Sequence, residues 1–95
     1  EGVIALDSGL IATHEAGAIE FTGHKVITIP GKEGKMEAKT LDQFMDDFLH
    51  DDNAAHSVYP GIVYITMPTE YGTLYSAKDL DDIYQVCQKY HCTLC

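Results

Sequence analysis

Pro60-Gly-Ile-Val-Tyr-Ile-Thr66 is the stretch of sequence that most directly indicates the fold. Two residues that interrupt regular structure are followed by a run of large apolar side chains with almost no polar alternation. A strand that faces water on one side alternates polar and apolar residues, whereas a strand buried on both sides does not. Residues 62–66 are therefore predicted to form a central strand of a parallel sheet.

Two further strands and a short helix are predicted before this stretch. Residues 3–6 and residues 25–30 are apolar or β-branched runs, which are typical of short buried strands. Between them, residues 14–21 contain small and apolar side chains and are followed by Gly23, a common end of a short helix. Residues 31–35, Gly-Lys-Glu-Gly-Lys, are predicted to form a surface turn because they lack the spacing of a phosphate-binding loop.

The first of two longer helices is predicted between the second strand and the central strand. Thr40 and Gln43 have the spacing of a capping box, in which two residues satisfy the first backbone N–H groups of a helix. The apolar residues that follow recur at the offsets that line one helical face: Leu41, Phe44, Met45, Phe48 and Leu49. A helix that begins at Thr40 would pack this face against the sheet.

The second longer helix is predicted after the central strand, where Ser76 and Asp79 repeat the capping-box spacing. Its expected apolar face consists of Leu80, Ile83, Tyr84, Cys87 and Tyr90. Residues 92–95 then begin another strand. Strands that alternate with helices of about a dozen residues are typical of right-handed βαβ units. The expected fold class is therefore α/β, with a mostly parallel sheet and flanking helices.

The charge balance restricts the partners that the chain can bind. Six lysines and no arginine stand against fifteen acidic residues, which gives a formal net charge of −9. Nucleic acids and anionic membrane surfaces are bound by basic patches, so neither is expected as a partner. No apolar run approaches the ~18 residues that span a bilayer, and the N-terminus lacks the order of a signal peptide. We therefore expect a soluble, cytoplasmic protein.

The cysteines and histidines suggest metal sites that their spacing does not support. Cys87, Cys92 and Cys95 have the spacing of an iron–sulfur motif, but such a cluster needs a fourth cysteine and the chain has three. His50 and His56 are six residues apart, outside the i, i+4 spacing of two ligands on one helical face. We expect structural, reduced thiols, a solvated acidic surface and no metal site.

His14-Glu-Ala-Gly-Ala-Ile-Glu20 is the stretch that most suggests chemistry. A His–Glu pair stands at the start of the predicted short helix, next to small residues that leave room for a flat ligand or a closely packed neighbour. Titratable groups in such a place are candidates for binding or catalysis. Helix capping and packing would explain the same residues, and the pattern alone leaves both interpretations open.

Three segments together resemble a known enzyme family. They are Asp7-Ser-Gly-Leu-Ile-Ala-Thr-His-Glu-Ala-Gly-Ala-Ile-Glu-Phe-Thr-Gly-His-Lys-Val26, Pro30-Gly31 and Thr69-Glu-Tyr-Gly-Thr-Leu-Tyr-Ser76. In this order they are similar to the low-specificity threonine aldolase and beta-eliminating lyase family. Its members are pyridoxal-phosphate enzymes with the aspartate-aminotransferase-like fold. The similarity extends over essentially all 95 residues.

The resemblance implies that residues 1–95 are a single segment, the incomplete central part of a large domain that binds pyridoxal 5'-phosphate. The strand that begins at Cys92 would lead into the family's Asp-Gly-Ala-Arg stretch, which this sequence does not contain. The lysine that forms the Schiff base with the cofactor, and the glycine-rich segment that holds its phosphate, are likewise expected outside these residues. The chain by itself is therefore not expected to be a competent enzyme.

The resemblance also assigns roles to individual residues. Leu10 matches the position at which the family commonly has a histidine stacked on the cofactor ring. A leucine can cover the ring, but it cannot hydrogen-bond to the substrate or move protons. His14 and Glu15 match positions near the substrate, so His14 is expected to contact the substrate and Glu15 to order a catalytic water. Thr69 and Glu70 match the loop that passes beside the ring and are expected to bind the cofactor.

The function that the resemblance implies is retro-aldol cleavage of a β-hydroxy-α-amino acid, such as threonine to glycine and acetaldehyde. Beta-elimination on an amino acid is the alternative within the same chemistry. A second alternative is an acidic α/β module that binds a partner and catalyses nothing, which the absence of arginine and the leucine at position 10 favour. The family likeness further implies a small-molecule amino-acid substrate and a homodimer or homotetramer.

Overall fold

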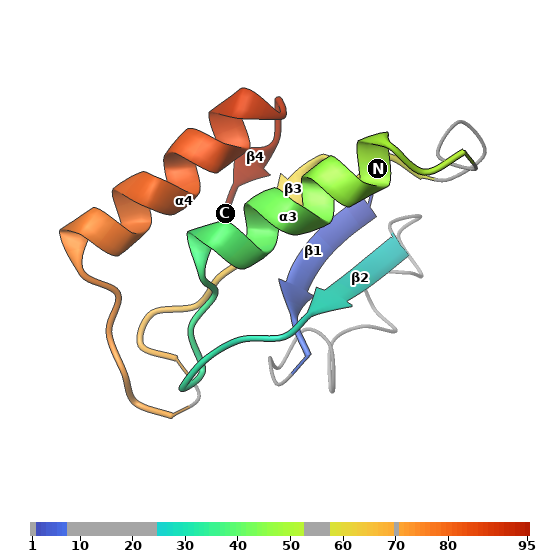
Figure 1. The fold of residues 1–95 in the computed structure, drawn as a ribbon. Helices are drawn as coiled ribbons and strands as arrows, with labels where there is room; N and C mark the ends of the chain where they lie inside the picture. The colour runs from blue at the N-terminus through green and yellow to red at the C-terminus, as the bar shows by residue number, and fades with distance from the viewer. Residues whose placement is uncertain (1, 8–24, 53–57, 70) are drawn as a thin grey trace.

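A computed structural model describes residues 2–7, 25–52, 58–69 and 71–95 of the chain. In these residues the elements follow the order β1 (Gly2–Leu6), β2 (Lys25–Ile29), α3 (Ala38–Leu49), β3 (Ile62–Val63), α4 (Ala77–Lys89) and β4 (Thr93–Leu94). Figure 1 shows α3 and α4 side by side on one face of the sheet. Neither of these two described helices is long and apolar enough to span a membrane. The helix predicted over residues 14–21 lies outside the described residues.

The strands form one parallel sheet in the order β2-β1-β3-β4. Val3 of β1 pairs with Val26 of β2 on one side and with Ile62 of β3 on the other. The helices α3 and α4 each connect a strand to the next parallel strand, as in βαβ units. The predicted α/β class with a mostly parallel sheet is confirmed, as is the central position of the strand at Ile62.

β3 is paired over two residues and is shorter than the predicted strand 62–66. Beyond the paired residues, the backbone N–H groups of Tyr64 and Ile65 still donate to the carbonyls of Ile4 and Cys95, at 2.8 and 3.0 Å. The chain therefore keeps sheet-like hydrogen bonds past the formal end of β3. It then turns into the loop that leads to α4.

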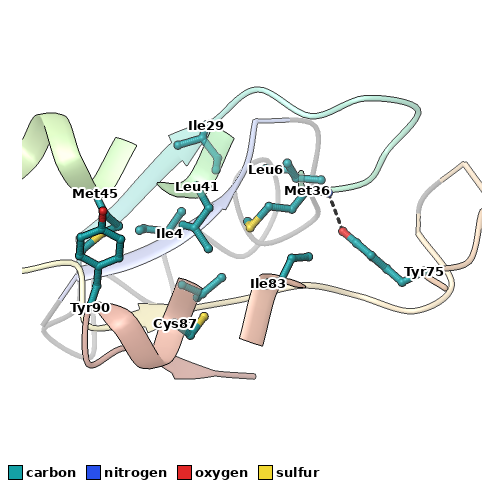
Figure 2. Packing of buried hydrophobic residues seen from close by; sticks show 11 residues of the cluster. Ile4, Leu6, Ile29, Met36, Leu41, Met45, Tyr75, Ile83, Cys87 and Tyr90 are labelled. Carbon is teal, nitrogen blue, oxygen red and sulfur yellow. Dashed lines mark hydrogen bonds between the residues drawn. The ribbon is translucent and has the colours of Figure 1, made fainter. Parts of the chain in front are cut away.

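The core lies between the sheet and the two helices. Figure 2 shows the buried side chains that meet there from the strands and both helices, among them Ile4, Leu6, Ile29, Leu41, Met45, Ile83 and Cys87. On the opposite face of the sheet, Val3 and Ala5 are buried and pack with Ile62 and Tyr64. β1 is therefore buried on both faces, which explains its apolar run without polar alternation.

α4 begins where the sequence predicts. The Ser76 hydroxyl accepts a hydrogen bond from the Asp79 backbone N–H at 3.0 Å, and the Asp79 carboxylate accepts one from the Ser76 N–H at 3.2 Å. These two bonds complete the predicted capping box. Ile83 and Cys87 are buried as expected, but Tyr84 is 47% exposed, so its assignment to the apolar face is wrong. Tyr84 lies about 100° around the helix from Ile83, which places it outside the buried stripe.

α3 begins earlier than predicted and without the predicted capping box. Its N-cap is Glu37, whose side chain makes no capping hydrogen bond in the described structure, and Thr40 is already inside the helix. The prediction at Thr40 is wrong because the first turn closes on Glu37, whose carbonyl accepts from the backbone N–H groups of Thr40 and Leu41 at 3.1 Å each. The buried Met36 donates its backbone N–H to the Tyr75 hydroxyl at 2.7 Å. Leu49, predicted on the apolar face, is the last helical residue and is 51% exposed.

The predicted surface turn at residues 31–35 is confirmed. Lys32 and Lys35 exchange backbone hydrogen bonds of 2.9 and 3.0 Å. Between them, Glu33 and Gly34 have φ angles of 53° and 78°. Positive φ is a left-handed conformation that glycine adopts without steric cost, so Gly34 suits its place in the turn.

Candidate functional site

The strand order creates a topological switch point between β1 and β3. After β1 the chain moves to β2 on one side, and it then crosses back to β3 on the other side. Open parallel sheets bind ligands at such a point, outside the carboxyl ends of the strands. Asp7 marks this edge, since its backbone N–H donates to the Ile29 carbonyl at 3.0 Å where β1 and β2 end together. The carboxyl edge around β1 and β3 is therefore the candidate site.

Four of the residues predicted to form the site lie outside the described residues. Leu10, His14 and Glu15 belong to the segment that follows β1, and Glu70 belongs to the loop that follows β3. Both segments follow a strand that borders the switch point. The roles assigned to these four residues stay predictions.

Thr69 is the predicted site residue that the structure describes. Thr69 is 6% exposed, and its hydroxyl accepts hydrogen bonds from the backbone N–H groups of Tyr71 and Thr73, each at 3.2 Å. The hydroxyl also contacts the Thr73 hydroxyl, which donates its own proton to the Glu33 carbonyl at 3.0 Å. Because the proton of Thr73 goes to Glu33, Thr69 is the donor in the contact between the two hydroxyls.

The Thr69 hydroxyl is saturated by its own loop. A threonine hydroxyl has one proton and two lone pairs, and the contacts with Tyr71 and Thr73 use all of them. The cofactor contact that the resemblance assigns to Thr69 stays a prediction and would come from its methyl group. The hydroxyl itself maintains the shape of the loop.

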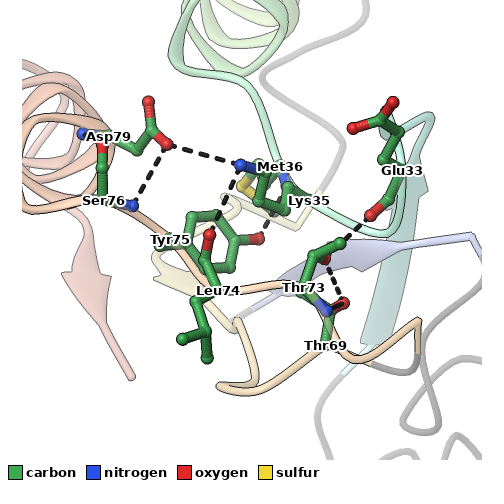
Figure 3. Close-up of polar contacts among 9 residues, drawn as sticks. All are labelled: Glu33, Lys35, Met36, Thr69, Thr73, Leu74, Tyr75, Ser76 and Asp79. Carbon is green, nitrogen blue, oxygen red and sulfur yellow. Dashed lines mark hydrogen bonds and ion pairs between the residues drawn. The ribbon is translucent and has the colours of Figure 1, made fainter.

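A set of hydrogen bonds joins this loop to the turn that follows β2. We name the two segments, residues 33–36 and residues 69 and 71–75, the carboxyl-edge clasp. Figure 3 shows them next to each other. In chain order, the bonds between them run from Thr73 Oγ1 to the Glu33 carbonyl (3.0 Å), from Lys35 Nζ to the Leu74 carbonyl (3.4 Å) and from the Met36 N–H to the Tyr75 hydroxyl (2.7 Å). The residue numbers of the partners rise together along both segments, so the two segments run in the same direction.

Gly34 lies at the tightest point of the clasp. A Cβ atom at this position would lie 3.0 Å from Thr69 Oγ1 and 3.2 Å from Cγ of the Tyr71 ring. Gly31, at the start of the same turn, lies close to the sheet. A Cβ atom at this position would lie 2.7 Å from Cδ2 of Leu6. The turn therefore packs against the carboxyl end of β1, which borders the switch point.

Tyr75 of the clasp and the neighbouring Asp79 each keep one charge state near neutral pH. Lys35 lies 3.6 Å from Asp79. The pKa of Asp79 is lowered, first by hydrogen bonds from the backbone and side chain of Ser76 and then by Lys35. Burial raises the pKa of the Tyr75 phenol, which therefore stays protonated. Asp79 and Tyr75 thus maintain structure and do not exchange protons near neutral pH.

The thiols and histidines do not form a second site in the part of the chain that the structure describes. Burial raises the pKa of the buried Cys87 to about 11, so it remains a thiol. Cys92 is half-buried and Cys95 is exposed. Over the same described ranges, no three His, Cys, Asp or Glu side chains gather as a metal ion would require. His50 is exposed at the end of α3, and His56 lies outside the described residues.

Sequence reasoning missed Gly34, Thr73 and Tyr75 as members of this edge. Part of the signal was present, because Thr73 and Tyr75 lie in the family-like segment and Gly34 lies in the predicted turn. Their contacts, however, join residues 39 or 40 positions apart. A local sequence pattern cannot predict contacts between residues so far apart in the sequence.

Comparison with known proteins agrees with the resemblance seen in the sequence. Residues 1–95 match the beta-eliminating lyase family. Among solved structures, the chain is similar to threonine aldolase from Leishmania major, with 41% sequence identity and a TM-score of 0.85. That match covers 98% of this chain and 26% of the Leishmania chain. A comparison with curated proteins gave no match. On the match over its full length, the chain belongs to the beta-eliminating lyase family.

Proposed function

We propose that residues 1–95 belong to a pyridoxal-phosphate-dependent lyase that cleaves a β-hydroxy-α-amino acid, threonine to glycine and acetaldehyde, by retro-aldol chemistry. The observation that carries this proposal is the similarity to Leishmania major threonine aldolase, with 41% identity over 98% of the chain. Because the match covers 26% of the Leishmania chain, we propose that these residues are the central segment of a larger cofactor-binding domain.

The described residues fit one wall of a pyridoxal 5'-phosphate site. The switch point between β1 and β3 is a place where a parallel sheet accepts a ligand, and the turn of the clasp packs against the end of β1 there. Lys35 lies 3.6 Å from Asp79 and donates to the Leu74 carbonyl at 3.4 Å, and we do not assign it to the cofactor's aldehyde. As the family resemblance implies, the cofactor lysine and the phosphate-binding segment are proposed to lie elsewhere in the larger protein.

When bound, pyridoxal phosphate supplies an electron sink for the electron pair that remains on the substrate after bond cleavage. The residues of this chain orient the substrate and handle protons. In this proposal, Glu15 orders a water next to the substrate and His14 contacts the substrate. Leu10 would cover a face of the ring, and Thr69 and Glu70 would lie beside it. Together these residues would orient the bond that breaks, and such positioning contributes to the rate.

The first test is the intact mass of the natural protein, purified from its source, with and without borohydride reduction. Reduction fixes pyridoxal phosphate permanently to its lysine and adds the mass of the adduct. We expect a chain much heavier than the 10.5 kDa of these residues, and we expect it to carry the adduct. A 10.5 kDa protein without the adduct would instead support the alternative of an acidic binding module.

The site assignments are tested in the same protein by threonine cleavage. Glu15→Gln is expected to lower turnover on the order of 10²-fold, the usual contribution of a positioned acid or base, while cofactor content stays unchanged. Leu10→His restores the family's ring-stacking residue and is expected to raise threonine cleavage. Unchanged turnover in Glu15→Gln would remove the role of Glu15, and unchanged turnover in Leu10→His would show that another group serves that position.

We also propose that the whole protein is a cytoplasmic homodimer or homotetramer that acts on a small amino acid. The family resemblance and the strongly acidic composition support this proposal. Light scattering on the purified protein measures the number of subunits, and cell fractionation measures the location. A monomer, or recovery in the membrane fraction, would contradict it.

A further inference from the structure

We propose that Thr73 is a positioning residue that holds the loop after β3 against the turn after β2, and thereby fixes one wall of the site. This inference rests on the proposed function, since the site is the one at which threonine cleavage is proposed to occur. Thr73 is assigned no contact with substrate or cofactor, and it acts through Thr69 and the backbone of the loop.

The hydrogen bonds of Thr73 make it the link between the two segments of the clasp. Its backbone N–H donates to Thr69 Oγ1 at 3.2 Å, and its carbonyl accepts from the Thr69 N–H at 3.0 Å. Its hydroxyl accepts from the Thr69 hydroxyl and donates to the Glu33 carbonyl at 3.0 Å. The two hydroxyls thus form a relay of hydrogen bonds in which Thr69 donates to Thr73 and Thr73 donates to the Glu33 carbonyl. If the Thr73 hydroxyl is removed, the Thr69 hydroxyl loses its acceptor and the Glu33 carbonyl loses this donor.

This relay of hydrogen bonds lies at the carboxyl edge of the sheet, where it can affect the geometry of the site. β1 lies between β2 and β3, so the clasp joins chain segments that leave the sheet on either side of β1. Thr69 is 6% exposed, and its hydroxyl cannot find water in place of Thr73 without a movement of the loop. A displacement of about 1 Å at a site of group transfer can cost up to about 100-fold in rate. Loss of the Thr73 hydroxyl is therefore transmitted through the buried Thr69 to the carboxyl edge.

The test compares Thr73→Val with Thr73→Ser in the whole, cofactor-loaded protein. Valine keeps the shape of threonine without the hydroxyl, and serine keeps the hydroxyl. Thr28→Val is the matched control, because Thr28 is an exposed residue of β2 outside the clasp. We expect Thr73→Val to lower kcat/KM for threonine about tenfold or more and to speed amide exchange at Tyr71 and Thr73 by a similar factor. Thr73→Ser and Thr28→Val are expected to stay within about twofold of the wild type in both measurements.

Two results would overturn the proposal: kinetic constants of Thr73→Val equal to those of the wild type, or equal losses in Thr73→Val and Thr73→Ser. If Thr73→Val does not fold, Gly34→Ala replaces it, because a Cβ at Gly34 presses on Thr69 Oγ1 from 3.0 Å. Normal kcat/KM in Gly34→Ala would then count against the clasp. If the wild-type protein cleaves no threonine, the proposed function is wrong, but the role of Thr73 is still tested. Amide exchange in Thr73→Val then decides whether the hydroxyl holds the loop.

Discussion

α3 and α4 lie side by side on one face of the sheet, but different interactions determine where they begin. α4 starts with the reciprocal bonds between Ser76 and Asp79, has an acid in its first turn and has Lys89 in its last turn. α3 has no acid in its first turn, no base in its last turn and, within the described structure, no side-chain cap. Just before its start, the backbone N–H of Met36 donates to the hydroxyl of the distant Tyr75.

The difference shows that the contacts next to the starts of two similar helices can join residues at very different separations in the sequence. The start of α4 is encoded by residues three positions apart, and its charged ends complement the helix dipole. Next to the start of α3, the hydrogen bond of Met36 is with a residue 39 positions away. We therefore expect α3 to depend on tertiary contacts more strongly than α4 does, and the following predictions test this expectation.

Leu41→Ala is expected to have the largest effect. Leu41 is fully buried between α3 and the sheet, and truncation of such a leucine costs about 2–5 kcal/mol. The free energy of opening, measured by amide hydrogen exchange across α3, should fall by this amount. Leu49→Ala is the matched control on the same helix, and it should change the value by less than about 0.5 kcal/mol because Leu49 is 51% exposed. Equal effects of the two substitutions would contradict the packing described here.

Tyr75→Phe tests whether a distant residue sets the start of α3. The substitution removes the acceptor of a buried Met36 N–H and should destabilise the first turn of α3 by about 1–3 kcal/mol. Amide exchange should quicken in that turn and remain unchanged in the middle of α4. Tyr84→Phe removes an exposed hydroxyl from α4 and serves as the control. If exchange in the two helices quickens equally, Tyr75 supports the whole core and not the start of α3.

Ser76→Ala and Thr40→Ala contrast a residue that caps a helix with one that does not. Ser76→Ala removes one half of the capping box and should destabilise α4 by about 0.5–2 kcal/mol. Thr40→Ala should leave α3 unchanged or stabilise it by a few tenths of a kcal/mol, because alanine is the better helix former inside a helix. Amide exchange in the first turn of each helix measures both effects. A loss of stability in Thr40→Ala comparable to that in Ser76→Ala would reinstate Thr40 as a cap.

Asp42→Asn is expected to have the smallest effect and to depend on pH. The Asp42 carboxylate accepts hydrogen bonds from the Tyr90 hydroxyl at 2.7 Å and from Lys89 Nζ at 3.0 Å. These bonds, Tyr90 first, lower the pKa of Asp42. The link between the helices is therefore complete above the unfolded pKa of about 3.9 and is lost as the pH falls through the lower, folded value.

The measurement for Asp42 is the melting temperature of the wild type and of Asp42→Asn between pH 6 and pH 3. The wild type should melt higher at pH 6, and the difference should shrink toward pH 3. Asp81→Asn, on an exposed position of α4, is the control and should show no such convergence. A difference that stays constant with pH would mean that Asp42 does not link the helices through its charge.

The sequence predicted those parts of the fold whose causes are local. The non-alternating run at residues 62–66 indicated a buried parallel strand, and Ser76 with Asp79 indicated the start of α4. The start of α3 was wrong because the helix begins at Ala38 and does not use the capping-box spacing at Thr40, and the contact beside this start joins Met36 to the remote Tyr75. Tyr84 was wrongly placed on the buried face of α4. The spacing of apolar residues predicts the centre of a buried helical stripe more accurately than its edges.

The candidate site was predictable through family resemblance more than through physical pattern. The segments 7–26 and 69–76 indicated the family, and in the sequence they follow β1 and β3, the two strands that border the switch point. Thr73 lies in the family-like segment, but nothing there indicated its contact, because a threonine in a loop is ordinary and its partner Glu33 contributes a backbone carbonyl. Backbone partners are invisible in a sequence, so the clasp could be found only from the structure.

The strand order also has a consequence for how the chain acquires its structure during synthesis. Of the described strands, β1 is made first, but Ile62, the partner of Val3 on its second side, is made about sixty residues later. At about 5–20 residues per second, β1 waits roughly 3–12 s with one edge open. An open apolar edge of this kind is a point at which a nascent chain can pair with a neighbour. β1, one of the two inner strands of the described sheet, is therefore the described strand that waits longest for its second partner while the chain is still on the ribosome.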